Sequence, residues 1–172
     1  NENLLKQNVR GLMKTTEDLI SFYDFIISGL EQETDLDTQG LISLLRGKSQ
    51  ADIVMARSIA STPYGYFQGT ESQYITQVRC QNRRNAAGQL VRQCANVQVE
   101  NPRYRQSQQE AKRMALYRHT NAIDRSLERM LDLSAASSQI SAAEKQELDE
   151  TVRKLKMEAD SMRRARPSGF LF

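Results

Sequence analysis

The sequence predicts a mainly α-helical protein: an elongated three-helix bundle, or coiled-coil hairpin, with a small insertion that carries short helices and a disulfide-linked β-hairpin. Three observations lead to this fold class. Apolar residues recur at spacings of four and three near both ends of the chain, which places them along one side of a helix. Only 3 prolines and 8 glycines occur in 172 residues. A central stretch alternates with period two and holds both cysteines, which is typical of a hairpin.

The first expected helix carries apolar residues at four-three spacing from Leu5 to Leu30. Its 26 residues would extend for ~39 Å. We expect the apolar side to widen toward the end, where it is joined by Ile20, Phe22, Phe25 and Ile27. Asp24 is expected to lie beside it in solvent. Such a regular heptad could equally pair with a copy of itself, so self-assembly stays open.

Two short helices are expected to open the insertion. The first runs from Thr38 to Arg46 and would end at Gly47, because glycine favours helix termination. The second follows a start signal at Ser49 to Asp52.

The loop of residues 61–69 contains three aromatic residues among turn-forming proline and glycine. Its aromatic side chains either plug the open end of a bundle or contact a partner, and both interpretations stay open. The candidate partner-binding residues of this loop are Tyr64, Tyr66 and Phe67.

The hairpin is expected between residues 71 and 99, with a turn near Gly88. Cys80 and Cys94 would then lie across from each other, within the ~7 Å between Cα atoms that a disulfide needs. The alternative is a pair of reduced thiols in a cytosolic protein. Polar surroundings favour the disulfide, which indicates a periplasmic or extracellular location.

Basic residues gather in the same region. Residues 77–118 hold 9 basic and 2 acidic side chains, whereas residues 1–76 hold 6 and 10, and residues 119–172 hold 9 of each. Clustered cations can bind nucleic acid by releasing phosphate counterions. We favour the alternative, an acidic protein surface, because the N-terminal part is acidic and a disulfide is expected. The candidate partner-binding residues here are Arg83, Arg84 and Arg92.

Two amphipathic helices joined by a polar turn complete the bundle. The first runs from about residue 103 to residue 134, and the second carries the apolar positions from Leu148 to Met162. Ser141 and Glu144 form a capping box between them. The expected division is a bundle of residues 1–31 and 103–166, an insertion of residues 32–102 and a tail of residues 167–172 that ends in Phe170, Leu171 and Phe172.

Motifs for catalysis, cofactors or metals are absent from the sequence. His119 is the sole histidine, and we expect it to be half-exposed and structural. With two thiols it does not make the four ligands of a zinc site. No apolar run approaches the ~20 residues of a membrane span, and we expect a leader or other residues to precede Asn1. The sequence therefore predicts a non-enzymatic protein without cofactor or metal, whose partners are proteins.

This layout resembles the minor pilus-tip subunits of bacterial type IV secretion and conjugation systems. In that family an elongated three-helix bundle carries a compact appendage and is exported to the periplasm. The resemblance implies a structural or adhesive subunit that engages other pilus components and has no enzymatic activity. The residues that carry it are the heptads Leu5–Leu30, Leu116–Met130 and Leu148–Met162, together with Cys80 and Cys94.

Overall fold

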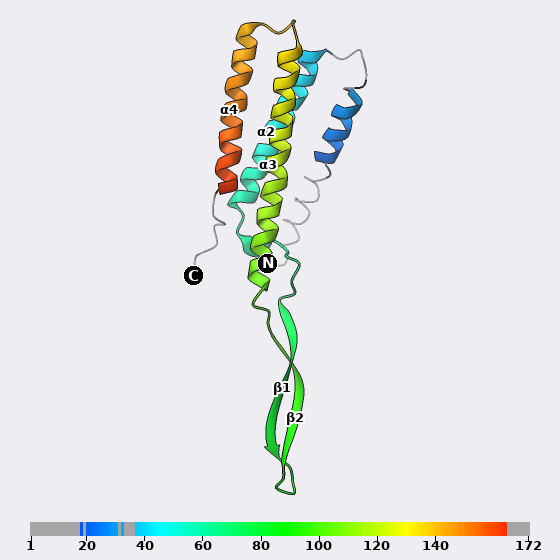
Figure 1. Ribbon diagram of the computed structural model, residues 1–172, viewed down its shortest axis with the longest axis vertical. Helices are drawn as coiled ribbons and strands as arrows, with labels where there is room; N and C mark the ends of the chain where they lie inside the picture. Colours follow the sequence, from blue (N-terminus) through cyan, green and yellow to red (C-terminus); the bar gives the residue numbers. More distant parts are fainter. Residues whose placement is uncertain (1–17, 19, 31, 33–36, 165–172) are drawn as a thin grey trace.

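The structure is a computed structural model that describes residues 18, 20–30, 32 and 37–164. Residues 20–30 are helical. The elements that follow are α2 (Thr38–Ser61), the 3-10 turn η1 (Tyr64–Tyr66), β1 (Tyr74–Arg84), β2 (Leu90–Glu100), α3 (Tyr104–Ala136) and α4 (Ala142–Arg164). The helices lie side by side in an elongated body, and the antiparallel hairpin projects from one end of it (Figure 1). The prediction of a mainly helical protein with one hairpin is confirmed.

The prediction of two short helices before the hairpin is wrong, because residues 38–61 form the single helix α2. Gly47 does not end it, since buried residues continue on one side of the helix, from Leu45 through Ser49 to Ile53. The Ser49 hydroxyl donates to the Leu45 carbonyl at 2.8 Å and so does not start a new helix. The helix begins at Asp37, whose carboxylate accepts from the Gln39 amide at 3.2 Å.

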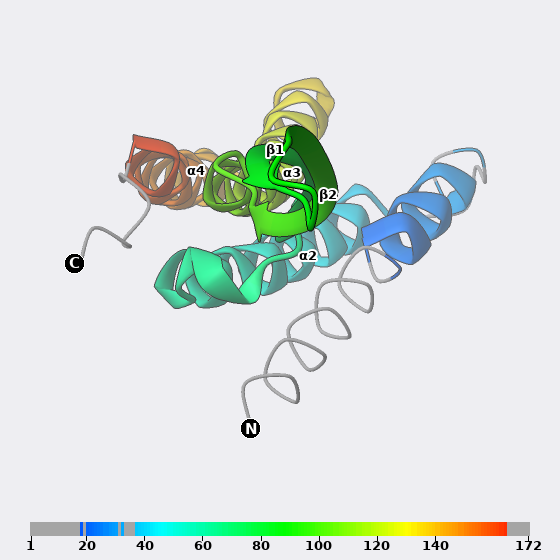
Figure 2. The ribbon, with the colours of Figure 1, turned by 90° about the horizontal axis from the view of Figure 1, so that it is seen from below.

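The core lies between α2, α3 and α4, which Figure 2 shows end-on. The α2 helix, which we expected within the insertion, therefore packs in the helical body. Apolar side chains from all three helices and from Ile27 form the main core cluster. Its most enclosed members are Leu45, Ile53, Ala56, Ile123, Leu127, Met130, Leu148, Val152 and Ala159.

The N-terminal heptad falls largely outside the described residues. Where it can be followed, Ile27 is buried, whereas Phe22 and Phe25 are exposed. The expected widening of the apolar side is therefore confirmed at Ile27 and wrong at Phe22 and Phe25. Asp24 lies half-exposed as expected, but its carboxylate is 3.5 Å from the Lys48 ammonium.

The capping box between α3 and α4 is confirmed. The Ser141 hydroxyl accepts from the Glu144 amide at 3.2 Å, and the Glu144 carboxylate accepts from the Ser141 amide at 3.0 Å. Two amides at the start of α4 are thereby satisfied. At its other end, Arg163 donates to the Thr120 hydroxyl at 2.9 Å and forms an ion pair with Asp124, which fixes α4 to α3.

The tail of residues 167–172 lies outside the described residues. In the part of the chain that the structure describes, no helix is long and apolar enough to cross a membrane.

Candidate interaction site: the hairpin arm and its root

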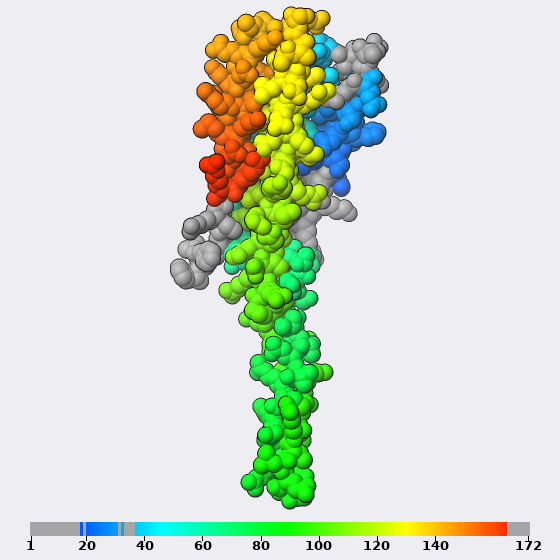
Figure 3. Space-filling view, in the orientation of Figure 1, coloured from blue at the N-terminus to red at the C-terminus, as the bar shows by residue number. Residues whose placement is uncertain are grey.

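The hairpin forms an arm, here defined as residues 74–100, that stands clear of the helical body (Figure 3). Each strand has 11 residues, so at ~3.3 Å per residue the arm reaches ~36 Å. Its tip is a tight turn in which the Asn85 side-chain oxygen accepts from the amides of Ala87 and Gln89 at 3.0 and 2.9 Å. Gly88 has φ +76°, a conformation that favours glycine.

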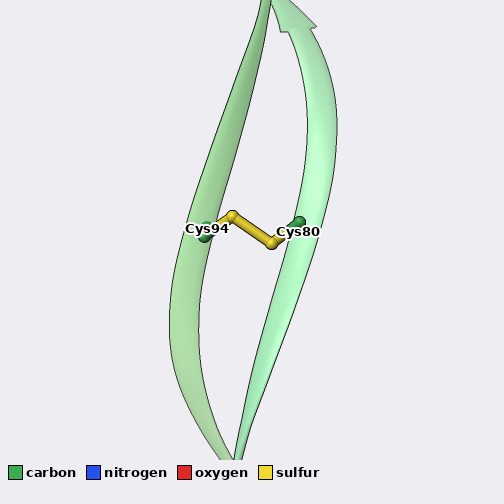
Figure 4. The surroundings of a disulfide bond; sticks show 2 residues. All are labelled: Cys80 and Cys94. Carbon is green, nitrogen blue, oxygen red and sulfur yellow. A yellow bond between two sulfur atoms is a disulfide. The ribbon is translucent and has the colours of Figure 1, made fainter.

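The predicted disulfide between Cys80 and Cys94 is confirmed, and it crosses the arm midway between root and tip (Figure 4). The Asn85 amide donates to the Gln89 carbonyl at 2.9 Å. Hydrogen-bonded and non-hydrogen-bonded residue pairs alternate along an antiparallel ladder. By this alternation Cys80 and Cys94 form a non-hydrogen-bonded pair, the type in which the two Cα atoms lie closer together. Their Cα atoms are 4.0 Å apart, so the strand register itself brings the two thiols together.

The arm carries four arginines and no carboxylate between residues 74 and 99. Side chains alternate between the two faces of a ribbon. Arg79 and Arg83 therefore lie on one face, and Arg84 and Arg92 on the other, where Leu90 and Asn82 are their cross-strand neighbours. All four are exposed, and among the described residues they form no ion pair; Arg83 has a weak hydrogen bond to Gln81 at 3.5 Å. Both faces are thus free to bind an anionic surface.

Asn101 fixes the arm to the helical body. Its amide donates to the Gln73 carbonyl at 2.9 Å, and its carbonyl accepts from the Tyr104 amide at 3.1 Å. Its side chain donates to the Ser72 carbonyl at 3.0 Å and accepts from the Arg103 amide at 3.0 Å. Asn101 is buried, and this buried network ties both strands to the first turn of α3, which holds the arm in one direction.

A second contact at the root is the approach of Gly69 to Ser107 of α3. A Cβ atom at Gly69 would lie 2.0 Å from the Ser107 hydroxyl oxygen and 2.4 Å from its backbone carbonyl carbon. Any side chain at position 69 would therefore push the root away from α3. A cavity of about 350 Å³ opens beside this contact, lined among others by Tyr66, Tyr104 and Gln108.

The aromatic loop has its residues at the root. Phe67 is 3 % exposed and packs with Ile59, Ala115 and Leu116, so it fills the end of the helical body and is not on the surface. Tyr64 and Tyr66 are half-buried.

The structure does not bring the loop aromatics together with the arm arginines. The loop aromatics lie at the root, where β1 begins at Tyr74. Arg83 follows Tyr74 by nine residues along β1, a distance of ~30 Å in an extended strand. Arg84 and Arg92 lie in the same distal half of the arm. The candidate residues thus fall into a root group and a distal group.

Sequence reasoning missed a buried polar cluster between the helices. Lys48 is 2 % exposed, and its ammonium lies 3.1 Å from Asp52, 3.3 Å from the Ser126 hydroxyl and 3.5 Å from Asp24. Burial raises the pKa of the Asp52 carboxyl, although Lys48 opposes this effect. Because Asp24, Lys48 and Ser126 come from three helices, this cluster holds the helical body together.

His119 is buried rather than half-exposed, so that expectation is wrong. It is 2 % exposed, and its Nδ1 has no hydrogen-bond partner. Burial lowers the pKa of His119, and the cations of Arg118 and Lys48 lower it further.

Lys112 is buried on the same helix, and its ammonium donates to the Ala60 carbonyl at 2.9 Å. It thereby supplies a cation at the C-terminal end of α2, whose own last turn has no basic residue. Burial lowers the pKa of this lysine.

Neither His119 nor the cluster around Lys48 assembles a metal site: no group of three or more potential ligands gathers among the described residues. Comparison with known proteins finds no protein family, no curated protein and no solved structure that matches this chain.

Proposed function

We propose that this protein is a non-enzymatic, extracytoplasmic interaction subunit, a component of a bacterial secretion or conjugation surface apparatus. Its helices act as an elongated three-helix strut, and the arm binds an acidic surface on a protein partner. The observation that carries the proposal is a projecting ribbon with four arginines and no carboxylate between residues 74 and 99.

The chemistry of arginine supports this partner class. Each guanidinium offers several donors in a planar fork that matches a carboxylate. Exposed arginines without internal partners need not break an existing ion pair before they bind one outside. A single sign of charge on a projecting element also attracts an oppositely charged partner from a distance and raises the association rate.

The disulfide supports an extracytoplasmic location. It lies on an arm that none of the described helices covers, so cytosolic reductants would reach it readily, whereas oxidising compartments preserve such bonds. The root supports a role for the arm as a fixed reach, because Asn101 and the Gly69–Ser107 contact hold it along α3.

The test is a pair of charge reversals that alter net charge equally. Arg83→Glu with Arg84→Glu reverses two exposed side chains of the arm, and Arg153→Glu with Lys154→Glu reverses two exposed side chains of α4. We expect the first pair to abolish capture of partner proteins from the extracytoplasmic fraction of source cells and the second pair to retain it. Thermal stability should be almost unchanged in both, because surface substitutions cost about 0.5 kcal/mol or less. Capture that survives the arm reversal would refute the proposal.

A second candidate function is nucleic-acid binding, favoured by the shape of the arm. The major groove of DNA admits a two-stranded ribbon, and four arginines would displace about four counterions. The slope of log affinity against log salt would then be roughly −3.6, so a fourfold rise in salt lowers affinity roughly 150-fold. An electrophoretic shift series at two ionic strengths, with the α4 reversal as control, separates this candidate from the first.

A further inference from the structure

Among the described residues, no strand pairs with the outer edge of β1 or of β2. The sheet has the two strands β1 and β2, and the register is continuous from Tyr74–Glu100 to Arg84–Leu90. The bonded pair at the tip joins Asn85 to Gln89, and the Asn101 amide bonds the Gln73 carbonyl at the root. Hydrogen-bonded pairs recur at every second residue, and the bonds at the tip and at the root both assign them to the odd-numbered residues of β1. The even-numbered residues of β1 therefore direct their backbone N–H and C=O groups outward, away from β2.

Apart from the charged arginines, these edges lack the features that usually protect a sheet edge. Proteins commonly blunt an exposed edge with proline, with a bulge or with a covering helix. Neither strand contains proline, the register contains no bulge, and none of the described helices covers the arm (Figure 1). Large apolar side chains are also exposed there, with Val78 at 66 % and Leu90 at 65 %. An isolated two-stranded ribbon is marginal in water, and a strand added beside β1 would increase its pairing and lie next to Val78.

The charges favour β1 over β2 and an acidic strand over a second copy. Three of the four arginines lie on β1, and β2 carries one. A second arm would bring four more arginines beside the first four, and like charges across paired strands are destabilising. An acidic strand has the opposite effect.

The register also specifies where the carboxylates would lie. The N–H groups of Arg79 and Arg83 point toward β2, so both residues would occupy non-hydrogen-bonded positions against a strand added outside β1. Side chains are closest at such positions. Because Arg79 and Arg83 are four residues apart on one face, the matching carboxylates would be four residues apart on the added strand.

We propose that the outer edge of β1 binds an extended, acidic segment of a partner protein as a third strand, with carboxylates four residues apart facing Arg79 and Arg83. This inference rests on the proposed function and deepens it, because it names the kind of partner segment. Outward backbone groups of residues such as Thr76 supply the affinity of strand addition, and the arginines supply its specificity.

The test uses a fluorescent peptide of threonine and valine with two glutamates four residues apart, titrated at low salt against the full chain. Thr76→Pro removes an outward N–H from β1, and Gln98→Pro removes the outward N–H of the residue directly opposite on β2. Proline is tolerated where the N–H faces away from the ladder. We expect Thr76→Pro to weaken peptide binding about tenfold or more and Gln98→Pro to change it by less than about twofold.

Two further comparisons keep the test decisive if a proline substitution disorders the arm. A peptide with N-methylated amides keeps its carboxylates but cannot pair with a strand, and it should not bind. Arg79→Gln should weaken binding more than Arg92→Gln, because only Arg79 lies on β1. Equal effects of the two prolines, equal binding of the methylated peptide, or no binding of the parent peptide would each overturn strand addition. If the methylated peptide binds and the arm reversal still abolishes partner capture, the arm binds anions by charge alone and the proposed function stands.

Discussion

Removing the disulfide should disorder the arm and leave the helical body folded. Cys80 and Cys94 are separated by 14 residues, and closing a loop of this size restricts the unfolded chain by ~3 kcal/mol. In the part of the chain that the structure describes, the strands of the arm pair only with each other and no helix covers them, so the disulfide is its main cross-link. Losing ~3 kcal/mol corresponds to a shift of about two orders of magnitude in the equilibrium between the ordered and the disordered arm.

The assay is amide hydrogen exchange of the variant Cys80→Ser with Cys94→Ser. In the native protein the amides of Gln77, Arg79 and Gln81 point into the ladder and should exchange slowly. In the variant they should exchange about a hundredfold faster. The amide of Leu127 in the core of α3 serves as the internal reference and should not change.

Two outcomes would refute this reasoning. Unchanged exchange of the arm amides would mean that the ribbon is stable without its covalent link. Equal acceleration at Leu127 would mean that the arm and the helical body unfold as one unit, although the described residues join them at the root, through Asn101 and the Gly69–Ser107 contact.

Two further predictions concern the helical body. Gly47→Ala should raise the free energy of unfolding by about 0.5–1 kcal/mol, because Gly47 lies inside α2 and an added Cβ meets no atom within 4 Å; a denaturant titration in which the midpoint does not rise would contradict it. His119→Leu should remove part of the pH dependence of stability. The pKa of His119 is lower in the folded protein than its usual 6.5, so the unfolded chain binds the proton more readily, and native stability falls as the pH drops below about 6.5. The raised pKa of Asp52 acts in the opposite direction in both proteins, so the difference between their unfolding free energies across pH 5 to 7 isolates His119, and parallel curves would contradict the assignment.

The elements that could be predicted from the sequence are those that short stretches of the chain determine by themselves. The hairpin follows from alternation on both sides of a turn, and the register then pairs Cys80 with Cys94 without help from the rest of the chain. The hairpin of α3 and α4 follows from two amphipathic stretches and the reciprocal bonds of Ser141 and Glu144. In each case the deciding signals lie in neighbouring stretches of the chain that a short turn joins.

The continuity of α2 depends on contacts that no local window contains. Glycine inside a helix costs about 1 kcal/mol, which by itself favours a stop at Gly47. Burial of Leu45 and Ile53 on either side contributes about 1.5–3 kcal/mol each. Because the free energy gained by burying these side chains exceeds the cost of the glycine, one helix forms where the local pattern predicts two.

The burial of two lysine ammonium groups could not be predicted from the sequence for a related reason. Lys48 and Lys112 resemble solvated lysines in sequence, since their oxygen partners Ser126 and Ala60 lie 78 and 52 positions away. Only the packing of α2 on α3 shows that both ammonium groups are internal. A buried cation is costly unless such partners are present, so these lysines depend on the assembled helices as much as they stabilise them.

The arginines of the arm show how register changes the meaning of a sequence cluster. Arg83 and Arg84 are adjacent in the chain and look like one basic patch, but the pleat of β1 places them on opposite faces. The functional neighbour of Arg83 is Arg79, four residues away, and that of Arg84 is Arg92 on the other strand. A single flat surface cannot engage Arg83 and Arg84 together. A partner that requires both must wrap the ribbon or extend its edge, and an added strand is the arrangement that reaches both faces from one side.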